Sequence, residues 1–156
     1  LLRSLQAAAV AVSAASLGRK TETISEGFAA ASFIMERTQA TVGNPLITAV
    51  QYALEQRAVS GQPFPDYQKV VAAPDASATA LATLRQVNAL LTEKATPDVA
   101  QGFKAWLLEI AQRTAAAGKE GGNFWGRGAV QINDAERAIL HEIAQILDVP
   151  PPEQMA

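Results

Sequence analysis

"TPDVAQGFKAWLLEIAQRTAAAG" (residues 96–118) is the stretch that decides the fold of this chain. Its large apolar residues recur at intervals of three and four, which places them on one face of a helix. These residues are Val99, Phe103, Trp106, Leu107 and Ile110. Thr96 followed by Pro97 is a typical helix start, and Gly118 is a typical helix end. The segment therefore predicts one long amphipathic helix.

The same spacing recurs on both sides of this segment, so we expect about six main helices. The other predicted stripes are Leu2, Leu5, Ala9, Val12 and Ser16; Ile24, Phe28, Ala31 and Met35; Leu46, Val50 and Leu54; Ala80, Leu84, Val87 and Leu91; and Ala135, Ile139, Ile143, Ile146 and Leu147. A short helical turn is expected over residues 66–72, and only residues 129–132 resemble a strand. The pattern predicts an all-α, single-domain helical bundle.

Polar residues ahead of two stripes predict where those helices begin. Thr23 is followed three residues later by Glu26, which fits a capping box. Asn44 directly precedes Pro45, which combines a preferred cap with a residue that favours the first helical position. We therefore expect helices to start close to Thr23 and at Asn44.

The composition limits the domain count and the classes of function. A chain of 156 residues is the size of one domain, which we assign to residues 1–149, and residues 150–156 form a proline-rich tail. Cysteine is absent, which excludes disulfides and thiolate chemistry. The 13 basic and 15 acidic residues are scattered without a basic cluster, so no nucleic-acid partner is expected.

The apolar N-terminal stretch bears on localisation. No run reaches the roughly 18 apolar residues that a membrane-spanning helix needs, so the sequence predicts a cytoplasmic protein. Residues 1–17 are nevertheless rich in alanine and other apolar residues. Membrane association through this segment is therefore kept as an alternative.

Two parts of the chain follow the same order of features. Residues 9–35 and residues 109–147 both run as an alanine-rich helix, a glycine with a basic residue, a polar loop, a polar cap and a second helix. This order indicates two pseudo-repeated α-hairpins. The alternative is that alanine-rich hairpins resemble one another without duplication.

The loop "GKEGGNFWGRGAVQINDAER" (residues 118–137) interrupts the second of these hairpins. Its glycines match neither the dinucleotide-binding spacing nor the Walker spacing, and it follows a helix rather than a strand. Phe124 and Trp125 lie between the glycines. They are candidate partner-binding residues of the kind enriched in interface hot spots, or they fold back onto the bundle.

Polar residues around this loop are the candidates for a metal site or a catalytic site. Glu120, Asp134 and Glu136 offer oxygen ligands to a hard cation, although helix capping also accounts for Asp134 and Glu136. His141 is the only histidine and follows on the polar side of the last stripe. It is either a solvated residue or the centre of a small enzyme site.

Residues 108–149 resemble the C-terminal hairpin of the tellurite-resistance TerB family and its TerB-like relatives. The match consists of an alanine-rich helix end, Glu120 with Gly121, the acidic helix start at Asp134 and Glu136, and the helix that follows. Residues 7–37 resemble the first hairpin of the same family. The resemblance implies an all-helical fold with internally similar halves.

The resemblance also implies a function. The family is linked to tellurite and general chemical stress, to complexes at the inner face of the membrane, and to divalent-cation binding by acidic loop residues. We therefore expect a non-enzymatic protein that binds a protein partner and a divalent cation such as Ca²⁺ through Glu120, Asp134 and Glu136. The alternatives are an ion-independent interaction module that uses Phe124 and Trp125, and a small enzyme with a site near His141.

Overall fold

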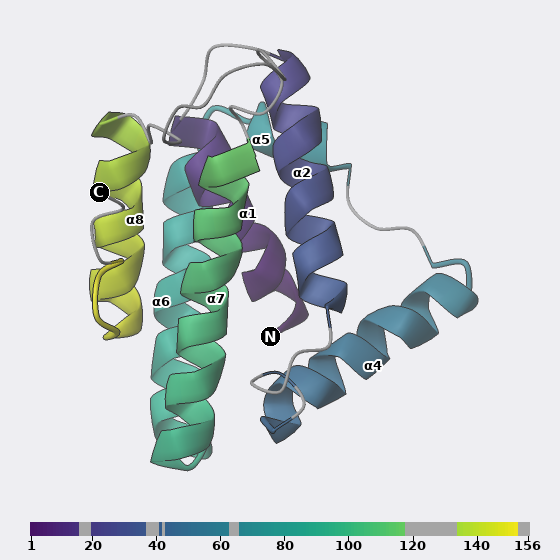
Figure 1. Cartoon of the computed structure of the whole chain (residues 1–156), viewed down its shortest axis with the longest axis vertical. Coiled ribbons are helices and arrows are strands. Elements are labelled where there is room, and N and C mark those ends of the chain that lie inside the picture. Colours follow the sequence, from purple (N-terminus) through teal and green to yellow (C-terminus); the bar gives the residue numbers. More distant parts are fainter. Residues whose placement is uncertain (16–19, 37–40, 42, 63–65, 118–133, 153–156) are drawn as a thin grey trace, which may run out of the picture.

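The structure is a computed structural model that describes residues 1–15, 20–36, 41, 43–62, 66–117 and 134–152. The helices are α1 (Leu2–Ala15), α2 (Lys20–Met35), α4 (Pro45–Val59), α5 (Tyr67–Val71), α6 (Ala76–Lys94), α7 (Pro97–Ala117) and α8 (Asp134–Leu147) (Figure 1). The described part of the chain contains no strand. This confirms the all-α helical bundle.

Helix α1 is the central helix of the bundle. It packs against α6, α7 and α8, and also against α2 and α5. Ten of its fourteen residues are buried, so burial is not limited to the predicted stripe. Alanine explains the difference, because its small side chain lets several helices approach one helix closely.

This burial also bears on the proposed membrane role of residues 1–17. Most of the apolar side chains of α1 lie in the protein core, although Leu2 is 37% exposed. Helix α1 therefore offers little apolar surface to a bilayer. Among the described helices, none combines the length and the hydropathy that spanning a membrane requires.

The long helix predicted from residues 96–118 is α7, and its apolar stripe is confirmed except at Val99, which is half-buried. Phe103, Trp106, Leu107 and Ile110 are all buried. The rings of Phe103 and Trp106 meet edge to face, with centroids 5.6 Å apart and planes at 69°. The stripe predicted on α6 is confirmed as well, since its four residues are buried. Both predictions hold because most large apolar residues of these helices lie on the face that packs, with Leu90 of α6 as an exposed exception.

The predicted start of the second helix is wrong. Helix α2 begins at Lys20, so Thr23 and Glu26 lie within its first turns instead of capping it. Lysine and glutamate are good helix formers, so the helix extends from Thr23 towards the N-terminus as far as Lys20. Helical propensity here outweighs the capping pattern.

The faces predicted for α2 and α8 are also partly wrong. On α2, Ala31 and Met35 are exposed, and Phe33 is buried. On α8, Ala135 is exposed, and Glu136 is buried in its place. Both helices have apolar or alanine residues on more than one side, so periodicity alone did not select the face that packs.

The cap predicted at Asn44 is confirmed, and Asn44 also joins α4 to α7. Its Oδ1 accepts hydrogen bonds from the backbone N–H of Leu46 (3.0 Å) and of Ile47 (3.3 Å). Its Nδ2 donates to the carbonyl oxygen of Val99 (2.9 Å). A Cβ on Gly102 would lie 2.6 Å from Nδ2, so only glycine leaves room for this contact.

A second polar contact holds α4 to the end of α2. The Nε2 of the buried Gln51 donates to the carbonyl oxygens of Ile34 (2.8 Å) and Glu36 (3.2 Å). The buried residues of α4 are Ile47, Val50 and Gln51, all in its first half. Beyond them α4 diverges from the bundle (Figure 1).

The short helix expected near residues 66–72 is α5, which is capped by Asp66. Its Tyr67 hydroxyl lies 2.8 Å from Ser13 Oγ, which ties α5 to α1. A Cβ on Gly27 would lie 2.8 Å from Cδ1 of Tyr67, so the tyrosine ring packs directly on the backbone of α2. Tyr67 therefore joins α1, α2 and α5.

Candidate functional site

The acidic residues predicted to bind a cation occupy different surroundings. The Asp134 side chain is 98% exposed, and its Oδ1 lies 2.7 Å from Nη1 of Arg137. Glu136 is only 3% exposed. Glu120 lies outside the described residues, and within the described ranges no three acidic or histidine side chains are grouped so that they would hold a metal. The cation site stays a prediction.

Of the other predicted site residues, the structure describes only His141. Phe124 and Trp125 lie outside the described residues, as do residues 129–132. His141 is exposed on α8. It does not line the pocket described next. The interaction loop and the enzyme site near His141 therefore stay predictions.

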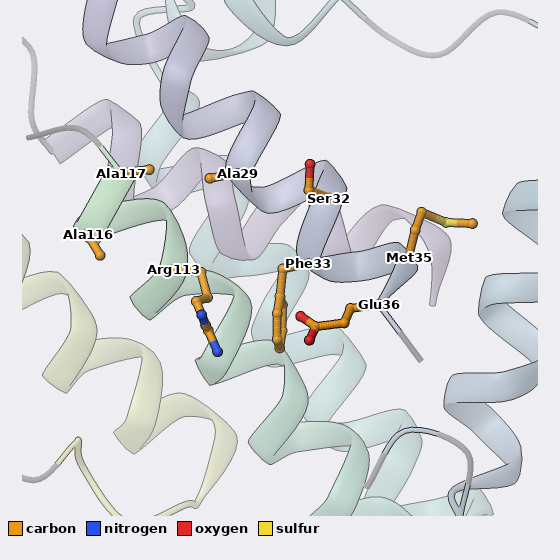
Figure 2. Close-up of a pocket in the computed structure, with 8 residues that line it drawn as sticks. All are labelled: Ala29, Ser32, Phe33, Met35, Glu36, Arg113, Ala116 and Ala117. Carbon is orange, nitrogen blue, oxygen red and sulfur yellow. The ribbon is translucent and has the colours of Figure 1, made fainter. Parts of the chain in front are cut away.

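A pocket of about 500 Å³ lies between α2 and α7 (Figure 2). It is lined by Ala29, Ser32, Phe33 and Met35 of α2, by Glu36 directly after α2, and by Arg113, Ala116 and Ala117 of α7. We call this pocket the α2–α7 groove. Its volume is in the range that is typical of ligand sites.

Small side chains explain why the groove is hollow. Ala29, Ala116 and Ala117 offer only methyl groups, and Ser32 adds one hydroxyl. The two helices pack against each other, but such short side chains do not fill the space between them. This end of the groove is therefore mostly apolar and has room for a bulkier side chain.

The other end of the groove carries an aromatic ring and two opposite charges. The guanidinium carbon of Arg113 lies 5.1 Å from the centroid of the Phe33 ring, a cation–π distance. Nη2 of Arg113 also lies 3.6 Å from Oε1 of Glu109, but both side chains are about half exposed, so this ion pair is weak. In the view of Figure 2, Arg113 and Glu36 lie on either side of Phe33.

Hydrogen bonds to the backbone fix the position of Glu36. Its carbonyl oxygen accepts from Nε2 of Gln51 (3.2 Å) and from Oγ1 of Thr41 (3.3 Å). Its N–H donates to the carbonyl oxygen of Phe33 (3.0 Å). Gln51 of α4 and Thr41 therefore fix the backbone at the charged end of the groove.

The groove combines apolar walls with a few polar groups. Among the described residues that line it, the polar side chains are the hydroxyl of Ser32, the guanidinium of Arg113 and the carboxylate of Glu36. Apolar walls with a few charged groups at one end are typical of grooves that receive an amphipathic segment.

The sequence patterns did not predict this groove. Its residues come from two segments about 80 positions apart, and neither segment carries a recognisable motif. The sequence feature that points to the groove is a set of small residues beside an aromatic residue. In a chain so rich in alanine, that signal does not stand out.

No protein-family model matches this chain, and neither a curated protein nor a solved structure matches it.

Proposed function

We propose that this protein is a non-enzymatic helical binding module that holds a segment of a protein partner in the α2–α7 groove. The groove itself is the observation that carries this proposal. It combines about 500 Å³ of space, walls of alanine and serine, and one arginine and one glutamate at a single end.

The groove indicates the kind of segment that it would receive. A bulky apolar side chain of the partner fills the hollow next to Ala116 and Ala117, where contact with methyl groups removes apolar surface from water. Polar or charged residues that flank this side chain pair with Arg113 and Glu36. Helix-in-groove recognition uses such a combination of apolar anchors and flanking polar groups.

The biological setting of the proposal follows from the resemblance to the TerB-like family. It is a cytoplasmic role in a tellurite or chemical-stress resistance system. In that role the protein assembles with a partner, at the inner face of the membrane or in the cytoplasm. The groove is compatible with this role because partner binding needs a complementary surface and no catalytic group.

Filling the groove tests the proposal. We expect Ala116→Trp to reduce the amount of partner that is co-purified from the native host by about tenfold or more, because the indole occupies the space of the partner's anchor. Ala82→Trp, at an exposed position of α6, is the matched control and should retain the partner. Quantitative mass spectrometry of the co-purified proteins measures the ratio.

Two outcomes of this experiment count against the groove. The first is equal co-purification of the same partner by Ala116→Trp, Ala82→Trp and the unmodified protein. The second is loss of the partner from Trp125→Ala with full retention by Ala116→Trp, which would favour the loop of Phe124 and Trp125. A thermal unfolding scan of each variant separates loss of binding from loss of folding.

Cation binding is a separate part of the proposal, with its own test. If the resemblance holds, calorimetric titration with Ca²⁺ should show heat for the unmodified protein and less heat for Glu120→Gln. Asp98→Asn, in the first turn of α7, is the matched control and should bind like the unmodified protein. The absence of heat from the unmodified protein contradicts the cation site and leaves the groove proposal intact.

A further inference from the structure

The α2–α7 groove carries two opposite charges that do not pair with each other. Arg113 and Glu36 lie on either side of the Phe33 ring, which separates the guanidinium from the carboxylate (Figure 2). Within the described part of the chain, Arg113 forms an ion pair with Glu109 and none with Glu36. The two charges at this end of the groove therefore do not neutralise each other.

The guanidinium of Arg113 is engaged by its own chain. Its central carbon lies 5.1 Å from the centroid of the Phe33 ring, and Nη2 lies 3.6 Å from Oε1 of Glu109. A carboxylate that a partner brought to Arg113 would be repelled by the carboxylate of Glu109, since both carry a negative charge. Arg113 is therefore poorly suited to select an acidic residue of a partner.

The carboxylate of Glu36 has no such counterpart. Glu36 is exposed, and in the ranges that the structure describes its hydrogen bonds are made by its backbone, while its side chain forms no ion pair. It directly follows Met35, the last residue of α2, where the helix dipole is negative, and the last turn of α2 contains no basic residue. The carboxylate and the helix end therefore both favour a cation here.

We propose that the partner segment carries a lysine or an arginine that pairs with Glu36 while its apolar anchor occupies the alanine end of the groove. This inference rests on the proposed function, because it names the chemistry of the segment that the groove receives. Met35 also lines the groove and is 43% exposed. Its apolar side chain suits a long basic residue, which combines a methylene stem with a charged head.

The dimensions of the groove set the spacing of the anchor and the basic residue. Along α2, Ala29 and Glu36 are seven positions apart, which corresponds to about 10 Å at 1.5 Å per residue. Along α7, Ala117 and Arg113 are four positions apart, which corresponds to about 6 Å. In a helical segment that lies along the groove, the two residues are therefore one or two turns apart, a spacing of four or seven positions.

Peptide display tests this chemistry with a defined probe. A library of random peptides of about 15 residues, long enough for a helix of several turns, is selected on the unmodified protein. Peptides that also bind Ala116→Trp are removed, so that the remaining peptides require the groove. We expect them to contain a bulky apolar residue with Lys or Arg four or seven positions away. Selection on Glu36→Lys should enrich Asp or Glu at those positions, because the substitution reverses the charge.

The affinity of one enriched peptide, measured by fluorescence anisotropy, gives a second readout. Glu36→Gln should weaken binding about threefold and Glu36→Lys about tenfold, the size expected for a charge pair that is exposed to solvent. Replacing the basic residue of the peptide by glutamate should restore binding to Glu36→Lys. Glu93→Gln, exposed on α6 and outside the groove, is the matched control and should bind like the unmodified protein.

The possible results separate this inference from the proposed function. If the peptides require the groove but show no preference for a basic residue, or prefer an acidic one, the inference is overturned and the groove proposal stands. The same holds if Glu36→Lys enriches the same peptides as the unmodified protein. If no peptide distinguishes the unmodified protein from Ala116→Trp, both the inference and the groove proposal are contradicted.

Discussion

Ala11→Leu is expected to lower the free energy of unfolding by about 3 kcal/mol, the upper part of the range for overpacked cores. Ala11 is completely buried on α1, the helix that packs against α6, α7 and α8. The larger side chain has no space there unless one of these helices moves. Urea denaturation measures the change, followed by the fluorescence of the buried Trp106 in a Trp125→Phe background.

The matched control for this substitution is Ala89→Leu, at an exposed position of α6. Both substitutions exchange the same residues within a helix, so they differ only in burial. The control should change the free energy of unfolding by about 0.5 kcal/mol or less. Similar effects of Ala11→Leu and Ala89→Leu would contradict the central position of α1.

Asn44→Ala is expected to cost about 2–4 kcal/mol, the sum of a lost helix cap and a lost buried hydrogen bond. The substitution leaves the N–H groups of Leu46 and Ile47 without their cap and the carbonyl oxygen of Val99 without its donor. Denaturation gives the size of the loss. Hydrogen exchange should show faster exchange in α4 than in α6.

Asp66→Ala is the control for Asn44→Ala. Asp66 caps α5 through two backbone N–H groups, Gln68 and Lys69, but these bonds are exposed and it joins no second helix in the contacts described. Its loss should cost about 1 kcal/mol or less. If the two alanine variants lose equal stability, then Asn44 is only a cap and does not join α4 to α7.

Asn44→Ala should also weaken partner binding. Gln51 of α4 donates a hydrogen bond to the carbonyl oxygen of Glu36 at the charged end of the groove, and Asn44 fixes the start of the same helix on α7. Loss of the contact between Asn44 and Val99 should therefore loosen this end of the groove.

The parts of the fold that depend on local chemistry were predictable from the sequence. Asn44 with Pro45 predicted a helix start because the cap and the first helical position are set by neighbouring residues. Phe103, Trp106 and Ile110 predicted the buried face of α7 because large apolar residues occur on one side of that helix only.

Features that depend on how helices pair were not predictable. The buried position of Glu136 on α8 and the exposed position of Met35 on α2 follow from which neighbours pack on these helices. The α2–α7 groove depends on α2 lying beside α7, so that Ala29 and Ala116, two residues far apart in the chain, line the same space. The periodicity of apolar residues describes each helix separately and does not show which helices pack against each other.

Photocrosslinking from within the groove is a direct test of partner binding by α2 and α7. Benzoylphenylalanine replaces Ser32, which lines the groove, or Ala82, which is exposed on α6, and the cells of the native host are irradiated. We expect one discrete adduct from position 32, no such adduct from position 82, and loss of the adduct when Ala116→Trp is added. The same adducts from both positions, or an adduct from position 32 that persists with Ala116→Trp, would contradict partner binding in the groove.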